Sequence, residues 1–177
     1  MYGKDRVQLE EVLIHEMCHV FLHLFHKDVI LSSWLHEGFA QYFEFLHNPA
    51  DPKVKLWKRL MKAMVREKST RPFPDFWVLP ISADDMEGYA QAWSLVSFLA
   101  QNADLRKKTG KFVIQLKEAA PSDAGYAIEL PTEPGQQAIR NALRKVYSLQ
   151  ADVFKDVYGK SPEEFEAAWK RYVLTTY

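Results

Sequence analysis

The chain has 177 residues, of which 47% are hydrophobic and 14% aromatic, enough to form a sizeable core in one domain. Its 23 basic and 23 acidic residues balance, so the net charge gives no support for a nucleic-acid or anionic-membrane partner. The one cysteine, Cys18, excludes an intrachain disulfide.

Neither a membrane span nor a secretory signal is expected. A transmembrane helix needs about 18 consecutive apolar residues, and no segment has them. The first residues, MYGKDRVQLEEV, lack the apolar stretch of a secretory signal. The sequence leaves the cellular location and the oligomeric state open.

The first half of the chain reads as three helices in succession. Apolar spacing predicts a helix at residues 7–25, and because this segment is apolar nearly all round, we expect it to be largely buried. A second helix is expected from Ser32 or Ser33, both good N-caps, to His47. Turn signals then precede a third helix at residues 52–68, which has one apolar face.

The segment 69–81 carries three prolines and reads as an ordered loop rich in aromatic residues. Phe73, Phe76 and Trp77 either line a substrate cleft or pack this loop against the core. Ser82 is expected to begin a fourth helix that runs to about Gln101, with Asp85 placed as the acid of a capping box.

Helices are also predicted at residues 104–119, 136–148 and 151–158, and a last helix follows Ser161-Pro162. Residues 121–135 read as a long loop, and Gly159 as a C-cap. No segment reads as a confident β-strand. The sequence therefore predicts a mainly α fold with about seven helices.

His15-Glu16-Met17-Cys18-His19 is an HExxH sequence on a predicted helix. Residues i and i+4 share one helical face, so both imidazoles can point at one ion. Glu16 projects to the side of the pair, where its carboxylate can reach a water molecule on the metal. The pattern predicts two metal ligands, His15 and His19, and one general base, Glu16.

A catalytic zinc site requires three protein ligands and an open position. Seventeen residues separate His19 from Glu37, which stands in the first turn of the next predicted helix within WLHEGFAQYFE. A tight helix–loop–helix hairpin would bring Glu37 back beside the first helix. Glu37 is therefore the predicted third ligand.

HExxH, a spacer of this length and EGFAQYFE together resemble the gluzincin zinc peptidases, and the peptidase-MA-like members in particular. The resemblance implies that His15, His19 and Glu37 bind zinc. It also implies that Glu16 is the base in the hydrolysis of a peptide or protein substrate. The chain would then be a single gluzincin-like helical domain over residues 1–177.

In this domain, residues 7–47 would form the active-site helices and residues 82–177 a C-terminal helical part.

The rival metzincin pattern fails, because Leu22 and Phe25 stand where it requires Gly and a further His. His36 departs from the aminopeptidase pattern, which usually has Asn there. Only 14 residues precede His15, too few for the β-sheet that precedes this helix in zincins, so we expect the helical half of a zincin-like fold with that sheet missing or minimal.

Downstream, GYAQAWSLV at residues 88–96 is similar to the Y-x-x-x-W helix of peptidase-MA-like proteins, and SPEEFEAAWKRYV to their closing helix. The resemblance implies that Tyr89 donates a hydrogen bond to the oxyanion. The alternative is a Tyr89 packed under the site with its hydroxyl tied to a neighbour.

Other residues near the motif have more ordinary interpretations. His23 and His26 are expected to be structural or solvent-facing, and Cys18 to be a small buried side chain. Metal-bound imidazoles usually need a partner on the other ring nitrogen, which Gln41 or Glu44 could provide.

The sequence thus predicts a zinc metallopeptidase. Two other classes remain open: a domain that keeps the ligands without catalysis, and a helical interaction protein in which HExxH is a coincidence. The substrate, the choice between endo- and exopeptidase action, and the activity of this chain alone are not readable from the sequence.

Overall fold

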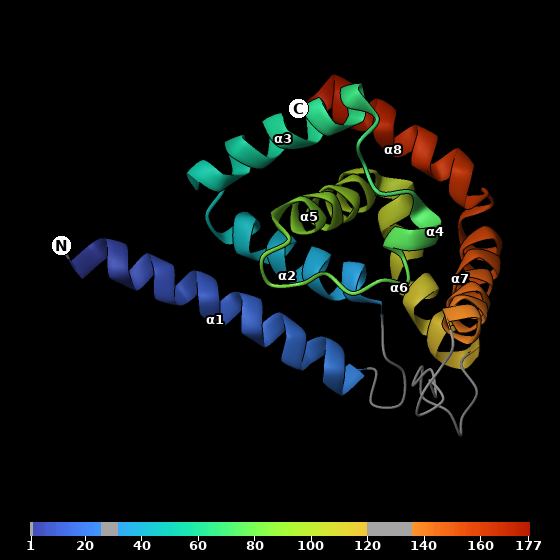
Figure 1. The fold of residues 1–177 in the computed structure, drawn as a ribbon. Coiled ribbons are helices and arrows are strands. Elements are labelled where there is room, and N and C mark those ends of the chain that lie inside the picture. The colour runs from blue at the N-terminus through green and yellow to red at the C-terminus, as the bar shows by residue number, and fades with distance from the viewer. Residues whose placement is uncertain (1, 26–31, 120–135) are drawn as a thin grey trace.

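The computed structural model describes residues 2–25, 32–119 and 136–177, and these ranges contain helices and no strand (Figure 1). The mainly α fold predicted from the sequence is confirmed. In chain order the helices are α1 (Tyr2–Phe25), α2 (Ser33–His47), α3 (Pro52–Glu67), α4 (Phe73–Phe76), α5 (Met86–Gln101), α6 (Ala103–Ala119), α7 (Gln136–Tyr158) and α8 (Pro162–Thr176).

Helix α5 runs through the middle of the structure, and α2, α3, α6 and α8 pack around it (Figure 1). Every residue from Ala90 to Leu99 is buried. The contact between α2 and α5 is close because α2 has a glycine where they meet. A Cβ atom on Gly38 would lie 2.7 Å from the Ala92 carbonyl oxygen.

Helix α2 lies between α1 and α5, and this position fixes the candidate site. Trp34, Leu35 and Phe45 of α2 are buried in the core. Glu37 and Glu44 interact with side chains of α1. One helix therefore connects the core to the HExxH segment.

The expectation that α1 is largely buried is wrong. This helix packs mainly against α2. Its outer face, which we define by five apolar residues, is 50–65% exposed: Leu9, Leu13, Met17, Val20 and Leu24. Apolar spacing shows that a helix has apolar faces, but not how many of them a neighbour covers.

The predicted loop at residues 69–81 contains the short helix α4. Phe73, Phe76 and Trp77 are each 1% exposed, so these residues pack into the core and do not line a cleft. Trp77 stacks on Trp34 with their ring centroids 5.8 Å apart. This packing orders the proline-rich segment against α2.

Helix α5 begins at Met86, four residues later than predicted, because Asp85 is its N-cap. The Asp85 carboxylate accepts a hydrogen bond from the Gly88 backbone N–H at 2.9 Å. Ser82 instead donates to Asp84.

The two helices predicted between residues 136 and 158 are one continuous helix, α7. The sequence there contains no glycine or proline that would end it, and Phe154 packs its second half into the core. Gly159 closes α7 with a φ of +70°, as predicted. Ser161 and Glu164 form the predicted capping box of α8. The loop predicted at residues 121–135 lies outside the described residues.

No helix in the described ranges is long and apolar enough to cross a membrane.

Candidate metal centre

Helix geometry places His15 and His19 one turn apart on the side of α1 that faces α2. Their Nε2 atoms lie 3.1 Å apart. Glu37 is the fifth residue of α2, at the start of its second turn, and it lies opposite this pair. Its Oε2 atom is 3.7 Å from His15 Nε2 and 3.6 Å from His19 Nε2. The predicted hairpin thus brings all three side chains together.

These distances suit a four-coordinate ion. Zinc bonds of about 2.0–2.1 Å in a tetrahedron place neighbouring ligand atoms about 3.3 Å apart. The three atoms of His15, His19 and Glu37 form a triangle of nearly this size, and they are a group that could hold a metal. Two imidazoles and one carboxylate are ligands that zinc accepts in catalytic sites.

Glu37 also has an unsatisfied atom. Its Oε2 is buried, and no donor among the described residues lies within hydrogen-bond distance of it. A buried carboxylate oxygen without a donor is costly unless a cation compensates it. The site therefore fits a cation at the point where the two imidazoles and Glu37 converge.

The other nitrogen of His15 faces two polar side chains of α2, of which only the Glu44 carboxylate can accept a proton from it, because the Gln41 amide nitrogen is a donor. His15 Nδ1 lies 3.2 Å from Glu44 Oε2, and Gln41 Nε2 lies 2.9 Å from the same nitrogen. Lys53 Nζ of α3 lies 3.6 Å from the second Glu44 oxygen, so Glu44 connects three helices. A proton on Nδ1 that is donated to Glu44 leaves the Nε2 lone pair free for a metal.

The charges of this cluster shift the pKa of both members of the His15–Glu44 pair. The interactions of His15 with Glu37 and then Glu44 raise its pKa to about 9, against the effect of burial. Burial alone would raise the pKa of Glu44, but its hydrogen bond with His15 and the charge of Lys53 outweigh this and lower the pKa. Glu44 is therefore ionised at neutral pH and suited to polarise His15.

Tyr89 of α5 is half-buried beside Glu37. Burial, then the negative charge of Glu37 and its interaction with the hydroxyl, raise the pKa of Tyr89. The charge of Glu16, which is exposed on α1, adds to this effect. The phenol is therefore protonated at neutral pH, and its hydroxyl interacts with Glu37.

Three further sequence candidates lie within the described residues. His36, in the first turn of α2, is half-buried, and its ring centroid is 5.9 Å from that of His19, so it contacts the site. His23 is exposed. Cys18 is buried, and its sulfur is not among the converging ligand atoms. His26 lies outside the described residues.

A neighbouring group of acids is already satisfied. The carboxylates of Glu11, Glu44 and Asp51 also lie within 4.8 Å of one another. Glu11 accepts a hydrogen bond from Asn48 at 2.6 Å, and Asp51 accepts one from the Lys53 backbone N–H at 2.7 Å. Glu44 is held by His15. The histidine pair is thus the better metal centre.

Sequence reasoning missed Lys53, whose charge acts on Glu44. Its side chain is exposed, as is usual for a lysine near the start of a helix with one apolar face. The sequence signal for the Lys53–Glu44 contact was the short turn from Asn48 to Asp51 that joins α2 to α3. A turn of this length keeps the start of α3 close to the end of α2.

Comparison of the chain with models of known families, with curated proteins and with solved structures finds no match.

Proposed function

We propose that this protein is a zinc-dependent metallopeptidase of the gluzincin kind, and that its described helices correspond to the helical half of a zincin-like domain. The observation that carries the proposal is the convergence of His15, His19 and Glu37, with a buried Glu37 oxygen that lacks a donor. His15, His19 and Glu37 would hold the ion.

When bound, zinc supplies polarisation of the scissile carbonyl and a lowered pKa for the attacking water. Glu16 is exposed beside His15 and His19. Its carboxylate would take a proton from the attacking water while the water oxygen bonds to the carbonyl carbon. Glu16 then returns the proton to the amine nitrogen as the C–N bond breaks. Tyr89 donates a hydrogen bond to the carbonyl oxygen as negative charge develops there.

Glu44 has a supporting role. Its carboxylate accepts the Nδ1 proton of His15, which directs Nε2 at the metal and fixes the orientation of the ring. Lys53 and Gln41 hold Glu44 in turn.

Two substitutions separate zinc binding from catalysis. Glu37→Ala removes one of three ligands and should abolish stoichiometric zinc, measured by metal analysis after dialysis. Glu16→Gln preserves the ligands, so it should keep zinc and lose cleavage of a peptide library read by mass spectrometry. Unchanged zinc in Glu37→Ala would remove Glu37 from the site, and cleavage retained by Glu16→Gln would remove the base.

Tyr89→Phe tests the oxyanion role. Loss of one such donor typically lowers kcat by about 10²–10³-fold. We expect a loss of this size with unchanged zinc content, because the ring still fills its half-buried place. If kcat changes less than threefold, Tyr89 has only a packing role.

A second candidate is a zinc-binding domain without catalysis that acts through an interaction surface. The exposed outer face of α1 favours it, because contiguous apolar surface commonly marks a binding site. In that case the zinc-loaded wild-type protein would cleave no member of the peptide library, although Glu37→Ala would still lose zinc.

A further inference from the structure

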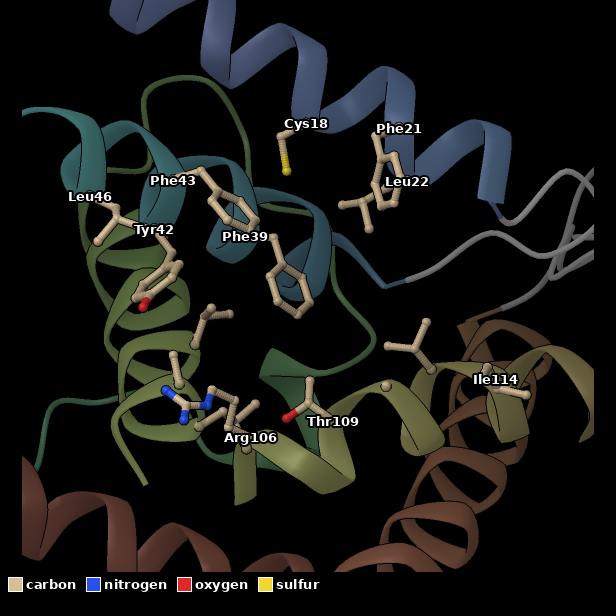
Figure 2. A pocket seen from close by; sticks show the side chains of 15 residues that line it. Cys18, Phe21, Leu22, Phe39, Tyr42, Phe43, Leu46, Arg106, Thr109 and Ile114 are labelled. Atoms are coloured by element: carbon tan, nitrogen blue, oxygen red, sulfur yellow. The ribbon is translucent and has the colours of Figure 1, made fainter. Parts of the chain in front are cut away.

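A large apolar cavity lies between α1, α2, α5 and α6 (Figure 2). Its volume is about 520 Å³, within the range of about 300–1,000 Å³ of small-molecule sites. In Figure 2, Cys18, Phe21 and Leu22 of α1 lie on one side, and Arg106 and Thr109 of α6 lie on the opposite side. The candidate metal centre does not use this apolar concavity.

The cavity is separate from the candidate metal centre. Its lining on α1 includes Phe21 and Leu22, and its lining on α2 includes Phe39, Phe43 and Leu46. None of the three converging ligand residues lines it. Occupancy of the cavity therefore does not require the metal.

A second apolar hollow of about 500 Å³ lies between α1 and α2. The two hollows share the lining residues Cys18, Phe21, Phe43 and Leu46, so they adjoin each other along α1. Phe21 and Leu46 are 65% and 61% exposed in the structure. An extended apolar space suits a long, flexible chain better than a compact ring system.

Among the described residues that line the cavity, Arg106 alone is charged. No acidic side chain within the described ranges forms an ion pair with it. The nearby Thr109 hydroxyl is already satisfied, since it donates to the Leu105 carbonyl at 2.9 Å and accepts from the Tyr158 hydroxyl at 3.2 Å. Within the described part of the chain, the cavity thus combines an apolar interior with a guanidinium group that no acid pairs.

We propose that this cavity binds a single-chain carboxylate of the fatty-acid class, with its alkyl chain among the apolar residues and its carboxylate on Arg106. Guanidinium groups bind carboxylates through paired N–H donors, which fixes the head of the ligand. The lining offers few other polar groups, so it lacks the several donors and acceptors that a sugar or a nucleotide would require.

Gly110 provides a variant that fills the cavity without disturbing the fold. It lines the cavity, and a Cβ atom added to it meets nothing within 4 Å. Gly110→Leu should therefore fold normally and occupy the space of the ligand. In calorimetric titrations with dodecanoate below its micelle concentration, we expect saturable binding by the wild-type protein and at least tenfold weaker binding by Gly110→Leu.

Two further comparisons test how the ligand lies in the cavity. The first varies the chain length of the carboxylate in the wild-type protein, and the second compares dodecanoate with dodecanol in Arg106→Gln. Affinity should rise about fourfold for each methylene from octanoate to dodecanoate, because each one buries more apolar surface. Arg106→Gln should weaken dodecanoate at least tenfold and leave dodecanol unchanged.

The proposal is overturned if the wild-type protein shows no saturable binding, if Gly110→Leu binds dodecanoate as the wild type does, or if Arg106→Gln weakens dodecanol equally. Circular dichroism verifies that each variant is folded. Zinc content should be unchanged in both variants, so failure here leaves the metallopeptidase proposal untouched, and failure of that proposal leaves this one untouched.

Discussion

The contact between His15 and Glu44 shows how a single residue of α2 can set the protonation state of a candidate ligand on α1. Glu44 is buried and ionised, and it faces Nδ1 of His15, whereas Nε2 points at the candidate metal centre. HExxH specifies two imidazoles on one face, because i and i+4 are neighbours on any α-helix. It does not specify the tautomer of either imidazole.

Glu44→Gln tests this contact. The amide keeps the size of the side chain but loses the charge that polarises His15. We expect zinc affinity to fall about 10–100-fold, the usual range for such partners of metal ligands. The measurement is competition with a chromophoric chelator.

Glu67→Gln, an exposed substitution at the end of α3, is the matched control and should leave zinc affinity unchanged. If Glu44→Gln also binds zinc within twofold of the wild type, Glu44 does not support His15.

At the scale of elements, the contact between α2 and α5 determines where Glu37 lies. Gly38 is the next residue along α2 and lies against the backbone of α5. The sequence EGFA was interpreted through its resemblance to a family. The structure adds a physical reason for the glycine: no side chain fits between the two helices at this point.

Gly38→Ala should therefore destabilise the protein. The added Cβ would lie 2.7 Å from both the Ala92 carbonyl oxygen and Val96 Cγ2, and the backbone atom cannot move away easily. We expect a loss of about 1–3 kcal/mol in the free energy of unfolding, measured by urea denaturation.

Gly110→Ala on α6 is the matched control, because its Cβ meets open space. It should stabilise the protein by about 0.5–1 kcal/mol, the usual gain for Ala over Gly within a helix. Equal effects of the two substitutions would show that the α2–α5 contact is not tight at Gly38.

At the scale of the whole molecule, the candidate metal centre joins a peripheral helix to the core. Aromatic side chains pack α4, α7 and α8 together, with the Phe154 and Phe165 rings 4.7 Å apart. Trp169 donates a hydrogen bond to Ser94 of α5 at 3.0 Å. By contrast, α1 packs mainly against α2, through the face that carries His15 and His19.

Zinc should accordingly stabilise α1 more than the aromatic core. A ligand that binds only the folded state, at a free concentration of about 1,000 times its Kd, adds about 4 kcal/mol to the free energy of unfolding. We expect zinc to slow hydrogen exchange of α1 amides strongly, and a chelator to reverse this. Amides of α5 and α8 should change little under conditions in which exchange occurs by local opening.

The Glu37→Ala variant should show no such response to zinc. If α1 amides exchange at the same rate with zinc and with chelator, the metal does not hold α1 against α2.

Local chemistry made most of the helices predictable. Helical spacing, N-caps and prolines located α2, α3 and α8, because these signals act within a few residues of the chain. The break predicted within α7 and the buried state predicted for α1 were wrong, since both depend on what packs against the helix. Phe154 holds α7 in the core, whereas the outer face of α1 has no neighbour among the described residues that buries it.

The sequence by itself determined that His15 and His19 share a face and that Glu37 follows on the next helix, because the α-helix repeats every 3.6 residues. Only the tertiary structure decided that Glu37 Oε2 lies within 3.7 Å of both imidazoles. It also decided that Glu44 pairs with both His15 and Lys53, and that Tyr89 interacts with Glu37. These side chains come from four different helices. Their meeting depends on how the helices pack, which no spacing within one helix records.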